Sequence, residues 1–483
     1  KARYLDVDVR VGTPEVDNTH EIRGEAGAEW RFYFRDPQPI PIEDDPDAIK
    51  AALWLETDRQ FKEAQERFTK VKTNIAVKVE EEDPSPDFSL EPPHKYMGEL
   101  LALEFDRATW LERVRRWSEL FNNSPIVYSS RVSLSANTTN KFLVNSEGTK
   151  IETGVNSIRL SIYGETTAED GMELYRYRSF DAREFGELPD EEAVQAAIAK
   201  MVEELTALRT APIVEPYIGP AILLNRASGV FFHEIFGHRI EGHRQKGAEE
   251  GQTFTKKVGE KILPEFISVY DDPTLETFQG KTVRGHYKYD DEGVSAQRVT
   301  VVEKGVLKNF LMSRSPVRGF PRSNGHGRRE YGHRVVARQG NLTVQSEKMV
   351  PYEELRKMLI AECRRQGKPY GLIFEDIAGG FTMTGRWLPQ AFKVVPLLVY
   401  RIYADGRPDQ VVRGVDIVGT PLTSFSRIVV TGDDYEVFNG NCGAESGWVP
   451  VSAISPSILV SEIEVEKQRK GQEKPPILPP PGL

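Results

Sequence analysis

The chain has 483 residues, of which 39% are hydrophobic and 28% charged, and its formal net charge is −10. This composition supports packed cores and excludes a wholly disordered protein, and the length predicts more than one domain. An acidic surface repels phosphate backbones, which argues against nucleic acid as a partner. No apolar run approaches the ~18–20 residues of a membrane-spanning helix, so a membrane span is excluded.

Cysteine content and the first residues bear on the compartment. Cys363 and Cys442 are the two cysteines, too few for a disulfide framework. The chain opens at Lys1 inside a stretch with strand-like alternation, and that stretch is not a signal peptide. We therefore expect residues upstream of Lys1 to be missing, and an exported form stays open.

The first half mixes helical and strand patterns. The patterns predict, in chain order, strands at 3–11 and 30–34, a helix at 47–69, a loop at 80–93, a helix at 97–121, strands between 125 and 177 and a helix at 190–209. We expect a layered α/β domain over residues 1–212.

The second half is rich in short apolar alternations separated by turns. Helical patterns occur after Asn225 and at 351–365, and the remainder favours strands. We expect a large, mostly β domain over residues 213–466, followed by an extended, Pro-rich tail at 467–483. The fold class expected for the whole chain is α+β.

The most informative stretch holds two histidines around a glutamate. His233 and Glu234 are adjacent, and His238 follows His233 by five residues. Neutral imidazoles bind zinc, and a neighbouring carboxylate can take a proton from a zinc-bound water. The common helical motif separates its histidines by four residues, whereas five residues miss the starting direction by roughly 140°. Either the helix contains a π-bulge near Gly237, or His238 lies beyond the helix end on a turn.

A catalytic zinc site needs a third protein ligand. Glu241, His243 and Cys442 are the candidates, and Cys442 is bracketed by glycines on a loop. Glu241 fits better as a residue that orients a histidine than as a ligand. A metal-free Cys–His pair with Cys442 as nucleophile is an alternative, although it leaves Glu234 without a role. Cys363, in a helical and basic context, is expected to be a buried structural residue.

Residues 233–242 resemble the signature of the TldD/PmbA family of metalloproteases, in the form carried by its motif-bearing members. Further segments resemble the same family in the same order: 289–294, 302–311, 324–330, 379–385 and 441–451. The likeness covers most of the chain from about 217 to 465, and the first half is similar more loosely.

The resemblance implies that His233, His238 and Cys442 hold Zn²⁺ and that Glu234 is catalytic. It also implies cleavage of unfolded peptides, a cytoplasmic location, and pairing either as a homodimer or with a homologous subunit that lacks the motif. The expected function is therefore a zinc-dependent peptidase. The alternative is a non-catalytic partner or binding module that keeps a structural metal.

Two other polar groups stand in family-like segments. Arg328 and Arg329 follow a Gly-rich stretch and are candidates for binding a peptide carboxylate or backbone carbonyls, against a structural ion-pair role. Asp290, Asp291 and Glu292 form an acidic run that is typical of a solvated turn, with a role in positioning substrate as the alternative.

Overall fold

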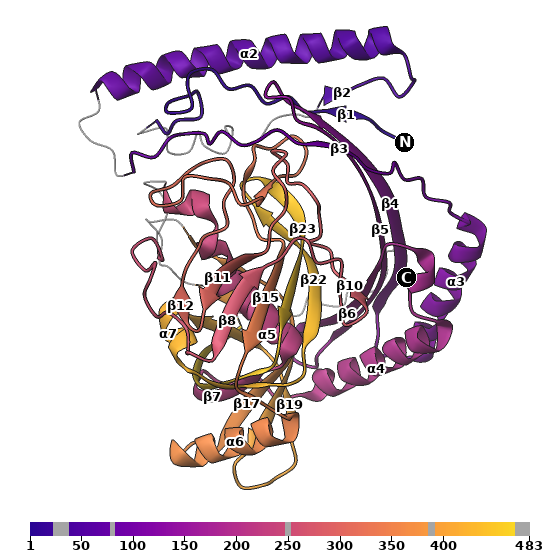
Figure 1. Ribbon diagram of the computed structural model, residues 1–483. Coiled ribbons are helices and arrows are strands. Elements are labelled where there is room, and N and C mark those ends of the chain that lie inside the picture. Colours follow the sequence, from indigo (N-terminus) through magenta and orange to yellow (C-terminus); the bar gives the residue numbers. More distant parts are fainter. Residues whose placement is uncertain (23–37, 78–82, 247–252, 385–391, 469–483) are drawn as a thin grey trace, which may run out of the picture.

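The computed structural model describes residues 1–22, 38–77, 83–246, 253–384 and 392–468. Figure 1 shows a strongly curved sheet from the first half of the chain that wraps around one side of the strands from the second half. The long helix α2 (Pro46–Val77) crosses one end of the molecule. Among the described residues, no helix is both long and apolar enough to span a bilayer.

The curved sheet is built on one continuous strand pair. β4 (Ser129–Val144) and β5 (Lys150–Thr167) run antiparallel in uninterrupted register, and the turn between them is held by the Asn145 side chain, which accepts from two backbone N–H groups. The second long edge of β5 pairs with β3 (Lys95–Met97) and β6 (Glu173–Ala182). The strands predicted between 125 and 177 are therefore confirmed.

Helices α3 (Arg107–Glu119) and α4 (Glu191–Thr210) cover the outer face of this sheet. Their apolar faces bury a cluster that includes Trp117, Leu160 and Leu205. The helix predicted at 190–209 is α4, and the Asp190 carboxylate caps it by accepting the Ala193 N–H.

Two predictions for the first half need correction, and a third lies outside the described residues. The helix predicted at 97–121 begins only at Arg107, because the Asp106 carboxylate caps the N–H groups of Ala108 and Thr109. The strand predicted at 3–11 is reduced to β1 (Tyr4–Leu5), paired with β2 (Gln38–Pro39). The predicted strand at 30–34 and most of the Pro-rich tail lie outside the described residues.

Two larger sheets form the second half, and both pack against helix α5 (Asn225–Ile235). The six-stranded sheet has the order β12 (Val306–Leu307), β11 (Val299–Glu303), β8 (Ile267–Asp271), β15 (Asn341–Ser346), β23 (Gly447–Ser455) and β22 (Glu436–Ala444). The eight-stranded sheet contains β16 (Met349–Val350), β21 (Ile428–Gly432), β24 (Ile458–Lys467), β20 (Val415–Gly419), β18 (Phe392–Tyr403), β17 (Tyr370–Thr382), β7 (Tyr217–Leu223) and β19 (Gln410–Val412). The fold class is α+β with a strand-rich second half, as expected.

The remaining elements are short or lie on the outside of these sheets. Helix α6 (Tyr352–Arg365) packs on the eight-stranded sheet, where Cys363 is buried among apolar side chains. In the described part of the chain, the others are α7 (Pro421–Ser426), the hairpins β9 (Thr277–Phe278) with β10 (Lys281–Thr282) and β13 (Gly327–Arg328) with β14 (Val336–Ala337), and the short 3-10 helices η1 (Leu120–Asn123), η2 (Phe185–Glu187), η3 (Gly237–Ile240) and η4 (Gly242–Gln245).

Buried ion pairs join the two halves. Arg176, on β6, contacts the carboxylates of Glu204 at 2.7 Å and Asp376 at 3.0 Å, and Asp376 also contacts Arg226 at the start of α5. These partners belong to α4, β17 and α5. The curved sheet is thereby fixed against the elements that carry the two histidines.

Candidate metal centre

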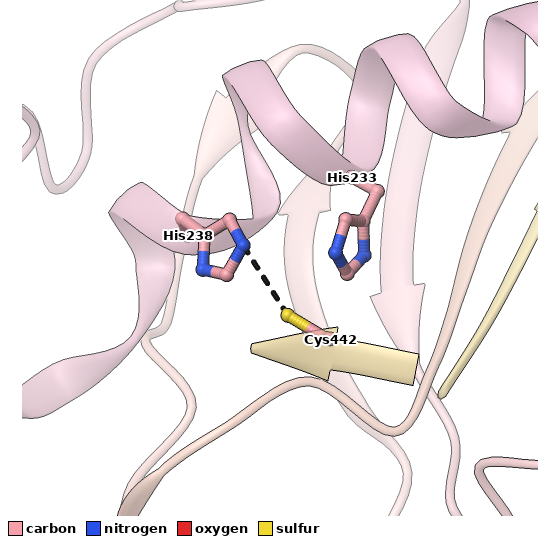
Figure 2. Close-up of side chains that lie close together, drawn as sticks. All are labelled: His233, His238 and Cys442. Atoms are coloured by element: carbon pink, nitrogen blue, oxygen red, sulfur yellow. Dashed lines mark hydrogen bonds between the residues drawn. The ribbon is translucent and has the colours of Figure 1, made fainter. Parts of the chain in front are cut away.

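The awkward five-residue spacing of the histidines is explained by the end of a helix. His233 lies on the last turn of α5, which ends at Ile235, and the chain then tightens into the 3-10 turn η3 that carries His238. Of the two alternatives that the sequence left open, the structure shows the second: His238 lies beyond the helix. Figure 2 shows the two rings turned towards one space from these successive elements.

A glycine makes this break sterically feasible. A Cβ on Gly237 would lie only 1.9 Å from Oε1 of Gln339, so a larger residue cannot occupy that position without moving Gln339. Gln339 in turn lies within 3.5 Å of the His233 carbonyl oxygen through its amide nitrogen. The segment that links β14 to β15 therefore packs directly into the break between the two histidines.

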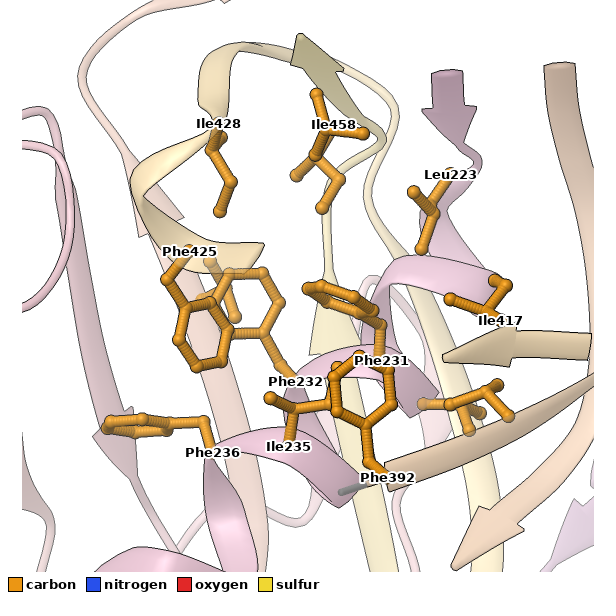
Figure 3. Close-up of a cluster of buried hydrophobic side chains, with 14 of the residues drawn as sticks. Leu223, Phe231, Phe232, Ile235, Phe236, Phe392, Ile417, Phe425, Ile428 and Ile458 are labelled. Atoms are coloured by element: carbon orange, nitrogen blue, oxygen red, sulfur yellow. The ribbon is translucent and has the colours of Figure 1, made fainter. Parts of the chain in front are cut away.

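Apolar packing fixes α5 in place. Phe231 and Phe232 are fully buried, and both pack against Phe425 of α7, while Phe236 meets the same ring edge-on. Figure 3 shows these rings between the strands and α7. Such a close-packed cluster resists rotation of the helix, so it sets the direction in which His233 points.

The third member of the cluster arrives from the end of the chain. Cys442 lies on β22, opposite Val449 of β23, and its sulfur is 3.3 Å from Nε2 of His238. One ligand atom from each of His233, His238 and Cys442 lies within 4.8 Å of the others, and all three side chains are buried. This is the one His/Cys/Asp/Glu group of three or more that the described residues form with potential to hold a metal ion.

The donor set suits a small divalent ion. Two ligands about 2.0–2.3 Å from a tetrahedral zinc are separated by roughly 3.5 Å, close to the spacing between the Cys442 sulfur and His238. Nδ1 of His233 is buried, and no hydrogen-bond partner for it occurs in the described part of the chain. A buried imidazole nitrogen in that position is costly unless a ligand occupies it. The residues therefore fit zinc.

The charges of the cluster favour a thiolate. Burial by itself raises the pKa of the Cys442 thiol, but the nearby charges of His238, Arg338 and His233 outweigh it and hold the pKa well below its usual range. For His238, burial lowers the pKa, and the charges of Cys442 and Glu241 more than offset that and raise it. A thiolate is the form of cysteine that binds metals.

Glu241 contacts the ring nitrogen of His238 that faces away from Cys442, as expected of a residue that orients this histidine. Its fully buried carboxylate contacts Nδ1 of His238 at 3.2 Å and accepts from Nε of Arg244 at 2.9 Å. With Nδ1 engaged, Nε2 is the nitrogen that His238 presents to Cys442. His243, the other candidate ligand, instead pairs with Glu445, which also accepts from Arg244.

Glu234 follows His233 directly on α5 and is also buried. Its side chain packs against β17, where a Cβ on Gly380 would come within 2.9 Å of Glu234 Cγ. Because Gly380 is a glycine, the side chain of Glu234 can occupy this space. The position beside a candidate ligand agrees with the predicted catalytic role, which remains a prediction.

The two predicted substrate-binding arginines contact the protein itself. Arg328 is buried and donates to the carbonyl oxygens of Gln339 and Pro450, at 2.6 and 2.7 Å. Arg329 donates to the carbonyl of His333 and pairs with Asp6. Their role towards a substrate stays a prediction.

Three further residues surround the cluster and were not predicted from the sequence: Gln339, Glu445 and Arg338. Arg338 is fully buried and donates to the Cys442 carbonyl oxygen. Glu445, three residues after Cys442, could have been noticed from its spacing. Gln339 and Arg338 are about 100 residues from either ligand segment, and no local pattern marks them.

Fold and site together define a mixed α+β protein with a buried His–His–Cys cluster beside a glutamate. The family model of the PmbA/TldA metallopeptidase C-terminal domain matches residues 217–467, more than half of the chain. The chain therefore belongs to this family of metallopeptidases, the TldD/PmbA family, and the resemblance seen in the sequence is confirmed.

Curated relatives carry names of the same kind. A metalloprotease of Methanocaldococcus jannaschii is 28% identical over 48% of this chain and 47% of its own length. A metalloprotease of Methanothermobacter thermautotrophicus is 26% identical over 69% of each chain. A zinc metalloprotease TldD homologue of Saccharolobus solfataricus is 24% identical over 51% of each. The match thus spans about half the length of the first and third of these relatives.

Solved structures agree on the fold. TldE from Thermococcus kodakarensis superposes with a TM-score of 0.56 at 14% identity, over 84% of this chain and 85% of that chain. A Thermotoga maritima protein gives the same TM-score at 20% identity, over 83% of each chain. These likenesses extend the shared architecture into the first half, beyond the region that the family model matches.

Proposed function

We propose that this chain is a zinc-dependent peptidase that cleaves unfolded or extended peptides. The observation that carries the proposal is the convergence of three buried donors, from α5, η3 and β22, on one space beside Glu234. His238 and Cys442 are 204 residues apart, yet their ligand atoms are 3.3 Å apart. Membership of a metallopeptidase family supports the same conclusion.

His233, His238 and Cys442 would hold the ion. Bound zinc supplies Lewis acidity that lowers the pKa of a coordinated water and polarises a carbonyl group. Glu241 holds Nδ1 of His238 so that Nε2 remains directed to the ligand position. Because all three donor side chains are buried, bulk water does not compete for their ligand atoms.

Glu234 is the proposed general base and acid. Its carboxylate takes a proton from the attacking water and then delivers that proton to the nitrogen of the leaving amine. For this role the Glu234 side chain must lie near the ion and must reach the substrate. Gly380 on β17 has no side chain, so the Glu234 side chain can lie against the backbone there.

The topology supports an extended substrate. β22, which carries Cys442, is the last strand in the order of the six-stranded sheet. A peptide that adds to the end of a sheet binds in an extended conformation, which requires an unfolded chain. We further propose a boundary near residue 212 between two domains, and pairing with a second copy or a homologous subunit.

Zinc content and peptide cleavage test the proposal together. Glu234→Ala is expected to keep one zinc per chain and to lose cleavage of an unfolded peptide, whereas Cys442→Ser loses both. Wild-type cleavage rates in Glu234→Ala would refute the assigned mechanism. Light scattering of the purified chain, alone and with a homologous subunit, tests the pairing.

A second candidate is a metal-independent cysteine hydrolase. The short distance between the Cys442 sulfur and His238, together with the lowered thiol pKa, is the arrangement of an activated nucleophile. Full activity after chelation would favour this candidate over the first. A zinc-bound chain that cleaves no unfolded peptide would instead favour a non-catalytic module with a structural metal.

A further inference from the structure

One buried guanidinium connects the two segments that supply the candidate ligands. Arg338 lies between β14 and β15 and is fully buried. It donates through Nη2 to the carbonyl oxygen of Cys442 at 2.6 Å, and through Nη1 to Ser446 Oγ at 2.8 Å and the Gly447 carbonyl at 3.0 Å. These three acceptors bracket the turn that joins β22 to β23.

The other side of the same guanidinium faces the helical segment. Nε of Arg338 lies 3.5 Å from Oε1 of Glu241, whose second oxygen contacts Nδ1 of His238. A continuous line of contacts therefore runs from the imidazole of His238 through Glu241 and Arg338 to the backbone of Cys442. Arg338 and Glu241 are both fully buried, so solvent does not screen their charges.

We propose that Arg338 is a positioning residue that sets the distance between the Cys442 sulfur and the His238 ring, and thereby the affinity of the site for its ion. The inference rests on the proposed metal site and deepens it. A planar guanidinium can hold the hairpin carbonyls with one edge while its Nε faces the carboxylate. A lysine has the charge but lacks this fixed fork, so it cannot hold both segments in register.

Cobalt binding tests the proposal without depending on catalysis. CoCl₂ is titrated into the metal-free chain, and the cobalt–thiolate absorption band and the dissociation constant are measured. Arg338→Lys is expected to fold, to bind Co²⁺ about 10- to 100-fold more weakly and to show a weakened or shifted thiolate band, as losses of groups that support metal ligands do. Cys442→Ser provides the spectrum without the band.

Arg413→Lys is the matched control. Arg413 is a buried arginine that donates to one carbonyl oxygen, that of Ala211, and pairs with one carboxylate, that of Asp170. This variant is expected to change thermal stability and to leave cobalt affinity and the band unchanged. Wild-type affinity and band in Arg338→Lys would overturn the inference.

A milder variant covers the case in which Arg338→Lys does not fold. Ser446→Ala removes one acceptor of the guanidinium and is expected to weaken Co²⁺ binding severalfold, and an unchanged affinity there would overturn the inference. Failure of the proposed site itself gives a different result: wild-type protein that binds Co²⁺ without a thiolate band.

Discussion

The two segments that supply the candidate ligands are held by different forces. The helical segment, α5 with η3, is packed on several sides by phenylalanine rings in the main core. The hairpin β22–β23 ends the six-stranded sheet, and its turn is held by hydrogen bonds from Arg338. Loss of a packed ring from the helical segment should therefore destabilise the fold, and changes around the hairpin should release the ion while the fold persists.

The largest expected effect comes from breaking the apolar packing. Phe232→Ala removes a fully buried ring stacked on Phe425, with ring centroids 5.5 Å apart, and should lower the free energy of unfolding by about 3–5 kcal/mol. Chemical denaturation followed by circular dichroism measures the loss. Val449→Ala, in the hairpin, should cost less because it removes fewer buried atoms. Equal losses would contradict the contrast between the two segments.

A substitution at the break between the histidines should affect both fold and site. Gly237→Ala places a methyl group against Gln339 and should cost about 3 kcal/mol, the upper end of typical overpacking costs, and weaken Co²⁺ binding. Gly186→Ala is the control, since an added Cβ there has no neighbour within 4 Å. If the two variants have the same melting temperature, the close approach of Gln339 does not require a glycine between α5 and η3.

Removal of the charge behind His238 should act mainly on the ion. Glu241→Gln weakens the contact to Nδ1 of His238 and should lower Co²⁺ affinity by about 10- to 100-fold. Glu204→Gln, which changes a buried carboxylate paired with Arg176, should leave that affinity unchanged. Isothermal titration measures the Co²⁺ affinity of both variants. Equal affinities would show that Glu241 does not support the ion site.

The smallest effect concerns the ion-paired residue Lys246, which lies beyond the helical segment. Asp87 contacts His20 and Lys246, and Lys246 follows η4 directly. Burial raises the pKa of Asp87, but the hydrogen bond from His20 and the charge of Lys246 outweigh it, so the folded-state pKa is lowered. The carboxylate therefore stabilises the fold above its unfolded pKa, about 4, and this contribution is lost as the pH falls through the folded-state pKa.

Asp87→Asn should accordingly cost about 1–2 kcal/mol at neutral pH, and the difference from wild type should shrink below about pH 4. Asp83→Asn in the same segment, whose hydrogen bonds go to Ser85 and Arg318, is the comparison. A difference that stays constant from pH 7 to pH 3 would argue against the assigned charge interactions.

Local patterns predicted many of the elements and singled out the residues that the structure brings together as candidate ligands. Alternation located the strands of the curved sheet, and the spacing of His233 and His238 indicated that a regular helix does not run through both histidines. The start of α3 was misjudged because residues 97–106 carry apolar side chains at helical spacing, whereas the cap at Asp106 decides where the helix begins.

Tertiary contacts account for what the sequence could not show. Asp290 belongs to an acidic run that is typical of a solvated turn, yet it is buried and accepts backbone N–H groups from Val294 and Gly327. The expectation of a solvated turn was wrong there, because hydrogen bonds across the fold replace water. Arg338 likewise acquires its role from partners about 100 residues away on either side.

X-ray absorption at the zinc edge tests the central claim most directly. The account predicts one zinc per chain, with one sulfur at about 2.3 Å and two imidazole nitrogens at about 2.0–2.1 Å, and loss of the sulfur shell in Cys442→Ser. A zinc shell of nitrogen and oxygen alone in the wild-type protein, or no stoichiometric zinc, would contradict it.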